Sequence, residues 1–260
     1  MAEARSHEAL VGGQFGSRAQ AYLASAVHAQ GQDLHDLAAR AEGRREARVL
    51  DLGCGGGHVG FAVAPRVREV VSYDLSSEML DLVARTASER GFANLAVRQG
   101  VAESLPFEAA RFDLVLSRFS AHHWRDFDAG LREAARVLKP GGIAGFVDAV
   151  TPGVPLLDTY FQAIELLRDP SHVRDYSRAE WLDALVRAGF EAGMVRSYRL
   201  RLDFASWVER MQTPKPQIDA IRALQAALSA GVTRYFETEP DGSFCIDVAF
   251  FNATKAAHQP

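Results

Sequence analysis

Apolar residues follow two alternating patterns from Ala47 onward. Short apolar runs favour strands buried on both faces, whereas apolar residues at three- and four-residue spacing favour amphipathic helices. The predicted strands are Arg48–Leu52, Glu69–Tyr73, Leu95–Gln99, Phe112–Ser117 and Ile143–Asp148. The predicted helices between them are Gly57–Ala64, Ser77–Arg90 and Asp128–Leu138, with Lys139–Gly142 as the turn that ends the last of these. Strands separated by helices predict βαβ units and a parallel sheet.

The chain after Val150 carries fewer strands and more helices. The predicted helices are Leu156–Leu167, Arg178–Ala188, Ala205–Met211 and Gln217–Ser229, and the predicted strands are Met194–Phe204 and Phe244–Phe250. A doubly wound sheet does not require the helices between the last two strands. We interpret them, together with Thr151–Tyr176, as a cap over the carboxyl edge of the sheet, where open α/β folds bind ligands. Before the first strand, Ser17 and Asp33 are predicted to cap two further helices.

A glycine-rich turn follows the first strand. In Asp51-Leu52-Gly53-Cys54-Gly55-Gly56-Gly57, an apolar strand runs into a turn that opens a helix. Glycine permits positive φ and a close approach of a ligand to the backbone, and the helix N-terminus offers free amides to an anionic group. Asp74 ends the second strand, where a carboxylate can accept both hydroxyls of an adenosine ribose. Together the two features predict a nucleoside-containing cofactor.

Two kinds of cofactor compete for this turn. The segment Gly55–Gly60 matches the dinucleotide pattern G-x-G-x-x-G, but its first glycine lies beyond the end of the strand. A register that begins at Gly53 places His58 where the third glycine belongs. Asp51, just ahead of the turn, suits an ammonium group, which S-adenosylmethionine (SAM) carries, better than a pyrophosphate. SAM is therefore favoured, with an NAD(P)-dependent oxidoreductase and a non-catalytic SAM-binding module as the alternatives.

Five segments occur in the order typical of class I SAM-dependent methyltransferases, which this chain resembles. They are Asp51-Leu52-Gly53-Cys54-Gly55, Asp74, residues 99–107 (QGVAESLPF), Phe112-Asp113-Leu114-Val115, and Leu138-Lys139-Pro140-Gly141-Gly142. Residues 15–22 and 175–190 also resemble the ubiquinone/menaquinone-biosynthesis-type branch. The resemblance implies a Rossmann-like α/β fold, with a mostly parallel seven-stranded sheet, helices on both faces and an α-helical cap. It implies transfer of a methyl group from SAM to an O, N or C atom of a small molecule, with S-adenosylhomocysteine as product.

The resemblance also implies the contacts at the methionine end of the cofactor. Gly53, Cys54 and Gly55 would lie against the methionine part, mainly through their backbone. Asp51 would lie near the amino group. Two further residues would close over this end, namely Tyr22 and Ser117.

The adenosine end has its own implied contacts. Asp74 would hold the ribose, with Leu75 and Met79 against the adenine. Ala102 would offer its amide to the ring, and Glu103 would accept a hydrogen bond from the exocyclic amine.

A histidine pair follows the fourth predicted strand. His122 and His123 would emerge at the same carboxyl edge as the glycine turn, and histidine titrates near neutral pH. They are the candidate catalytic bases, which a methyl acceptor needs only if it carries a proton. We expect the neighbouring Trp124 to pack in the protein interior, and His7, His28 and His35 to lie on helix surfaces.

Composition and charge limit the classes of partner that we expect this protein to bind. The 260 residues carry a net charge of -4, which leaves no basic surplus for a nucleic acid. We find no apolar run of membrane-spanning or signal-peptide length. Two cysteines outside any metal-ligand spacing favour a reducing compartment, the cytoplasm, and no metal centre. For the oligomeric state, we expect a monomer or a homodimer.

Three parts make up the expected organisation. Residues 1–46 would supply N-terminal helices that cover the cofactor, residues 47–150 the SAM-binding core, and residues 151–260 the rest of the sheet with the cap. Together they would form one structural domain.

Overall fold

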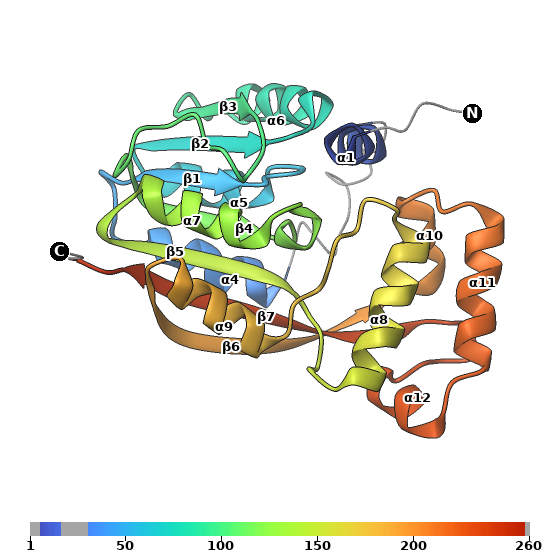
Figure 1. Cartoon of the computed structure of the whole chain (residues 1–260). Coiled ribbons are helices and arrows are strands. Elements are labelled where there is room, and N and C mark those ends of the chain that lie inside the picture. The colour runs from blue at the N-terminus through green and yellow to red at the C-terminus, as the bar shows by residue number, and fades with distance from the viewer. Residues whose placement is uncertain (1–5, 17–30, 258–260) are drawn as a thin grey trace.

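One sheet organises the protein. The structure is a computed structural model that describes residues 6–16 and 31–257. Within these residues, seven strands lie in the order β3-β2-β1-β4-β5-β7-β6 (Figure 1). They are β1 (Arg48–Leu52), β2 (Glu69–Asp74), β3 (Leu95–Gln99), β4 (Phe112–Arg118), β5 (Leu138–Val150), β6 (Phe190–Leu202) and β7 (Phe244–Lys255). Strands β1 to β5 run parallel, and β7 runs antiparallel to both of its neighbours.

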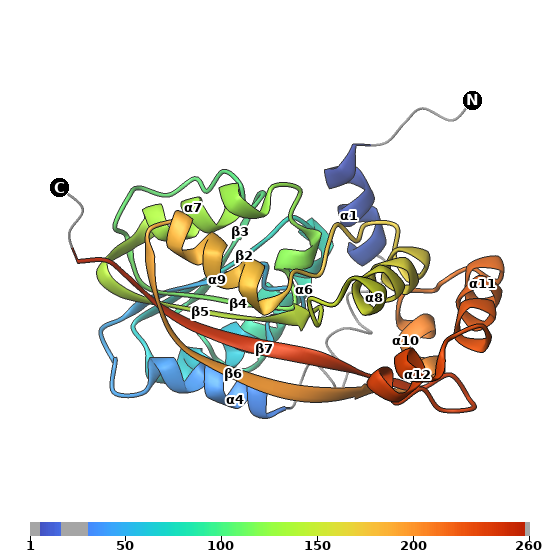
Figure 2. The same ribbon diagram turned by 60° about the horizontal axis from the view of Figure 1, so that its bottom comes forward.

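Helices cover both faces of this sheet. One face packs against α4 (Gln32–Ala38), α5 (His58–Val63) and α6 (Ser77–Glu89), and the other against α7 (Phe127–Val137) and α9 (Arg178–Arg187). Figure 2 shows α4 on one side of the sheet and α7 and α9 on the other. Successive strand side chains point to opposite faces, so Val49 joins the core under α4 and α5 whereas Leu50 joins the core under α7. Short 3₁₀ turns follow α4 and α5 at Ala39–Ala41 and Ala64–Arg66. The predicted fold class is confirmed.

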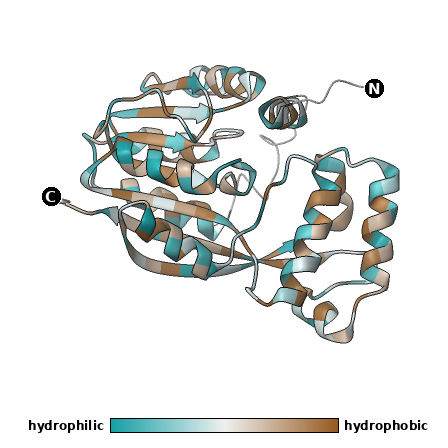
Figure 3. Cartoon of the chain, viewed as in Figure 1, coloured by the Kyte–Doolittle hydropathy of each residue, from teal (hydrophilic) through white to brown (hydrophobic). Residues whose placement is uncertain are grey.

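A layer of helices lies beyond the carboxyl edge of the parallel strands. It consists of α8 (Pro155–Arg168), α10 (Phe204–Arg210), α11 (Lys215–Ala226) and α12 (Ala230–Phe236) (Figure 1). Strands β6 and β7 run out to this layer, where Leu202 pairs with Phe244. Hydrophobic and hydrophilic segments alternate along α8 and α11 in Figure 3, as they do on helices with one buried side.

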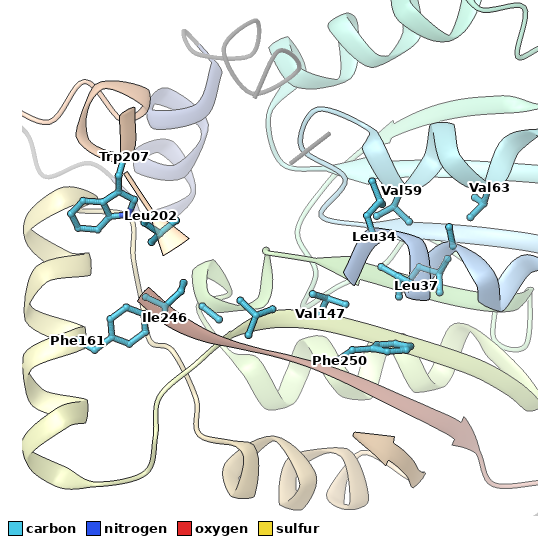
Figure 4. Close-up of a cluster of buried hydrophobic side chains, with 14 of the residues drawn as sticks. Leu34, Leu37, Val59, Val63, Val147, Phe161, Leu202, Trp207, Ile246 and Phe250 are labelled. Atoms are coloured by element: carbon cyan, nitrogen blue, oxygen red, sulfur yellow. The ribbon is translucent and has the colours of Figure 1, made fainter. Parts of the chain in front are cut away.

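The apolar core continues from the sheet into the helical layer. Phe161 of α8 and Trp207 of α10 meet the outer ends of β6 and β7, while Val147 and Phe250 carry the same cluster back under the sheet (Figure 4). Phe161, Trp207 and Phe250 are each at most 2% exposed. Fully burying such a side chain contributes about 1.5–3 kcal/mol, so this cluster fixes the position of α8 and α10 on the sheet.

The sequence patterns locate most elements and miss a few. Two strands, β1 and β3, have the predicted bounds, whereas β5, β6 and β7 are longer than predicted. The helices α1 (His7–Gly16) and α12 were not predicted, and the helix predicted to begin at Ser17 lies outside the described residues. The residues of the predicted turn, Lys139–Gly142, are part of β5. The pairing of β4 with β5 shifts register between Phe112 and Leu114, and Gly141 has a φ of +71°.

The prediction that Asp33 caps a helix is wrong. Gly31, with φ 141°, occupies the N-cap of α4, and no side chain caps it. Asp33 lies inside α4, and its carboxylate accepts a 2.6 Å hydrogen bond from Nε of Arg118 at the end of β4. The buried guanidinium of Arg118 requires a counter-charge, and Asp33 supplies it.

Candidate functional site

The glycine turn after β1 has the conformation that the sequence predicts. Gly53, Gly55 and Gly57 have φ values of +69°, +47° and +79°, which favour glycine. The amides of Gly53 and Cys54 both donate to the carbonyl of Tyr73, at 2.8 and 3.0 Å, which ties the turn to β2. A Cβ on Gly53 would lie 1.8 Å from Oγ of Ser120, so no larger residue fits here without a shift.

Asp74 lies directly across from this turn. Its Oδ2 accepts a 2.8 Å hydrogen bond from the amide of Gly55, and its Oδ1 accepts one at 2.9 Å from the amide of Ser76. Ser76 caps α6, as its side chain accepts from the amide of Met79. Burial raises the pKa of Asp74, and backbone hydrogen bonds from Ser76, Gly55 and Leu75 oppose that effect. A carboxylate offers about four acceptor positions, so the backbone donors do not occupy all of them.

Asp51 lies near the end of β1, directly before the glycine turn. The side chain is 1% exposed, and its Oδ2 accepts a 2.9 Å hydrogen bond from the amide of Gly60 in α5. Burial raises its pKa to about 7, helped by the nearby negative charge of Asp74 and opposed by the hydrogen bond from Gly60 and the charge of Arg118. A cation beside Asp51 would stabilise its ionised form.

A single cavity of about 1070 Å³, counted with its opening to solvent, joins these groups at the carboxyl edge of the sheet. Segments that follow β1, β2, β3 and β4 supply most of its wall. Helix α1 also contributes to the wall. Two contacts hold it there: Nε2 of His7 lies 3.0 Å from the carbonyl oxygen of His123, and Glu8 pairs with Arg125 at 2.8 Å. The cavity is therefore enclosed by parts of the chain that are far apart in sequence.

Most of the predicted site residues line this cavity. Those that do are Asp51, Gly53, Cys54, Gly55, Asp74, Leu75, Met79, Ala102, Glu103 and His123. Ser117 is 2% exposed within β4 and is not part of the lining, nor is His122. Tyr22 lies outside the described residues.

The adenine side of the predicted site is apolar with one acid. Met79 is 1% exposed, and Ala102 is 8% exposed. Tyr73 donates from its hydroxyl to the carbonyl of Val101 at 3.1 Å, which anchors the segment after β3. Glu103 accepts a 3.2 Å hydrogen bond from the amide of Asp126, so its carboxylate is held at the rim.

The two predicted histidines lie on the 3₁₀ turn Ala121–His123 that follows β4. Nδ1 of His122 lies 2.6 Å from Oδ1 of Asp148. Burial alone would lower the pKa of His122, but the carboxylate of Asp148 outweighs it and raises that pKa to about 9. His123 has its Nδ1 3.2 Å from the carbonyl oxygen of Ser171, and burial together with the charge of His122 lowers its pKa to about 4.

Ser120, Phe119 and His7 are among the lining residues that the sequence analysis did not assign to the site. Ser120 lies under the glycine turn and accepts a 3.1 Å hydrogen bond from Nε1 of Trp124, which is buried, at 6% exposed, and also lines the cavity. Phe119, at φ +52°, makes the sharp bend that brings Ser120 there. His7 lines the cavity, although we expected it on a helix surface; a lone histidine near the N-terminus has no local signal for such a role. His35 is exposed, as predicted.

Among the described residues, no helix is both long enough and apolar enough to cross a membrane.

Comparisons with known proteins agree with this geometry. Residues 49–142 match the model of a family described as methyltransferase domain. The uncharacterized protein YafE of Escherichia coli is 47% identical over 77% of this chain and 97% of its own length. The uncharacterized methyltransferase YcgJ of Bacillus subtilis is 39% identical over 77% of this chain and 79% of its own length.

Solved structures give the same result. The crystal structure of YcgJ superposes with a TM-score of 0.83 at 34% identity, over 86% of this chain and 98% of that one. A putative methyltransferase from Bacillus halodurans superposes with a TM-score of 0.83 at 31% identity, over 87% of this chain and 100% of that one. The chain therefore belongs to the methyltransferase-domain family and has the Rossmann-like fold of class I methyltransferases.

Proposed function

We propose that this protein transfers a methyl group from SAM to a small-molecule acceptor. The observation that carries the proposal is the meeting of the glycine turn and Asp74 on one cavity wall, with Gly55 N and Asp74 Oδ2 2.8 Å apart. Fold and family membership support it. They favour it over the oxidoreductase alternative, whose glycine pattern this turn fits poorly.

The residues of the cavity suit the parts of SAM. Asp51, buried and next to the turn, is suited to the ammonium group of the methionine moiety. Asp74 offers a carboxylate to the ribose hydroxyls, and Leu75 and Met79 offer apolar contacts to an adenine ring. The glycines let the methionine part approach the backbone, since no Cβ lies in the way.

When bound, SAM supplies a methyl group on an already activated sulfonium, so the leaving group needs no further activation. The protein then has to hold the donor, align the acceptor and exclude water. Helix α1 closes one side of the cavity through His7 and Glu8, which limits access of solvent. His123 and Trp124 line the side next to the helical layer, where we place the acceptor.

The acceptor is a small molecule whose reacting atom (O, N or C) is still open. Relatives include a demethylmenaquinone methyltransferase of Chlorobaculum parvum, 34% identical over 45% of this chain, and a malonyl-[acyl-carrier protein] O-methyltransferase of Enterobacter lignolyticus, 29% identical over 77%. The two names state different methyl acceptors, so these relatives do not identify the acceptor of this protein. The catalytic roles of His122 and His123, the cytoplasmic location and the choice between monomer and homodimer stay predictions.

Isothermal titration with SAM, S-adenosylhomocysteine and NADH tests the proposal. We expect binding of the first two and none of the third. Folded protein that binds NADH and neither sulfur compound would contradict the proposal. A screen of metabolites with radiolabelled SAM then separates an enzyme from a SAM-binding module, because label transfer must occur with the wild type and fall in Asp74→Ala.

A further inference from the structure

A cluster of buried acids and histidines lies behind the cavity wall. Three of its members are His122 from the turn after β4, Asp148 from β5, and Asp175 from the segment between α8 and α9. One potential ligand atom of each lies within 4.8 Å of those of the other two. Asp148 and Asp175 are 2% and 1% exposed, and none of the three residues lines the cavity.

Negative groups outnumber positive ones around this point. Four carboxyl groups are buried together, those of Asp148, Glu165, Asp169 and Asp175. The positive groups beside them are the Arg168 guanidinium, which pairs with Glu165 at 3.4 Å, and the imidazole of His122, whose pKa the carboxylate of Asp148 raises to about 9. Burying carboxylates in excess of cations is costly unless a proton or a metal ion compensates them.

The hydrogen bonds show which carboxyl group lacks compensation. Asp148 accepts from the amides of Ala121 and Ala149, each at 2.9 Å, besides its contact with His122. Asp169 accepts from the amide and the hydroxyl of Ser171. These two carboxyl groups are therefore supported by the protein itself.

Asp175 differs from them. Among the residues that the structure describes, its Oδ2 has no hydrogen-bond partner although it is fully buried. The imidazole Nε2 of His172 lies 3.7 Å away, too far for a hydrogen bond, and faces Oε1 of Gln162 at 2.9 Å. Burial raises the pKa of Asp175 well above its usual value, so a proton compensates the carboxyl group in the free protein, and a metal ion that binds there would displace this proton.

We propose that His122, Asp148 and Asp175 bind one divalent metal ion. One imidazole and two carboxylates are a ligand set that suits Zn²⁺, Mn²⁺ or Fe²⁺. Three protein ligands leave coordination positions that water molecules can complete. His122 precedes the cavity-lining His123, and their rings are 4.2 Å apart, so the metal lies directly behind the side where we place the acceptor. The site does not depend on the proposed cofactor.

The test uses full-length protein stripped with a chelator and kept free of SAM. Titration calorimetry with MnCl₂ and with ZnCl₂ measures the affinity and the stoichiometry. We expect one equivalent to bind with a raised melting temperature, and Asp175→Asn to weaken binding by at least about tenfold. The matched control is Asp183→Asn, which removes an exposed carboxylate from α9 and leaves the affinity unchanged.

A second measurement holds even if Asp175→Asn fails to fold. Spin-echo EPR of Mn²⁺ bound to the wild type detects the ¹⁴N coupling of a ligating imidazole. That coupling supports the proposal and disappears in His122→Gln. Absence of metal binding by the wild type, equal affinity of Asp175→Asn, or bound Mn²⁺ without nitrogen coupling would each overturn it. A failure of the SAM titrations would leave this result unaffected, because those titrations test a different set of residues.

Discussion

Oδ2 of Asp74 lies 2.8 Å from the amide nitrogen of Gly55, so the end of β2 and the turn after β1 are joined by a direct hydrogen bond. This bond holds the carboxylate at the cavity wall before any ligand binds. A preorganised group loses little freedom on binding, which favours affinity.

Asp74→Asn therefore weakens S-adenosylhomocysteine binding. Hydrogen bonds to a charged group contribute about 1.5–3 kcal/mol, so we expect a loss of roughly 10- to 100-fold in affinity, measured by calorimetry. Asp81→Asn, on the exposed side of the following helix, is the control and keeps wild-type affinity. Wild-type affinity of Asp74→Asn would remove the carboxylate from the cofactor site.

Gly53→Ala destabilises the fold more than Gly141→Ala does. Both glycines have positive φ, +69° and +71°, so both substitutions carry a similar backbone strain of about 1–2 kcal/mol. The new Cβ at position 53 also meets Ser120, whereas nothing lies within 4 Å at position 141. Chemical denaturation measures both free energies of unfolding. Equal losses would mean that the close approach at Ser120 has no energetic effect.

The affinity for S-adenosylhomocysteine, which keeps the ammonium group, rises with pH toward neutrality. Burial raises the pKa of Asp51 to about 7, so below that pH the free protein carries a proton there, with Asp74 and Arg118 as the nearby charges. An ammonium ligand favours the ionised carboxylate, so binding releases this proton, and affinity grows until the pH exceeds the free-state pKa.

Calorimetry in buffers of different ionisation enthalpy, between about pH 5.5 and 8, measures this proton release. Asp51→Asn should bind more weakly and lose the release linked to this group. Identical proton release in Asp51→Asn and the wild type would show that another group titrates.

Asp33→Asn removes the carboxylate charge that Nε of Arg118 contacts at 2.6 Å. The two side chains are 13% and 4% exposed, and breaking a buried pair costs about 3–5 kcal/mol. The double variant Asp33→Asn/Arg118→Met removes both charges and should regain much of that loss in thermal unfolding. Asp219→Asn breaks the exposed pair with Lys215 and should change stability by less than about 1 kcal/mol. No recovery in the double variant would contradict this account.

Local patterns predicted the parts of the site that are continuous in sequence. The turn at Gly53 and the acid at Asp74 each follow an apolar strand, and parallel strands bring such ends to one edge. The contacts of His7 with His123 and of Asp33 with Arg118 join elements more than 80 residues apart, so no spacing reveals them. The sequence pattern places Asp148 only at the end of an apolar strand. Its contact with His122 joins two elements and forms only in the assembled sheet.

The pairing of Leu202 with Phe244 has an evolutionary consequence. The chain leaves the sheet at one residue and re-enters it at the neighbouring one, so the stretch that carries α10, α11 and α12 is an excursion between the two arms of a hairpin. Such an excursion can be lengthened, shortened or exchanged while every strand keeps its register. Changes in this excursion would therefore alter the helical layer and leave the glycine turn and Asp74 in place.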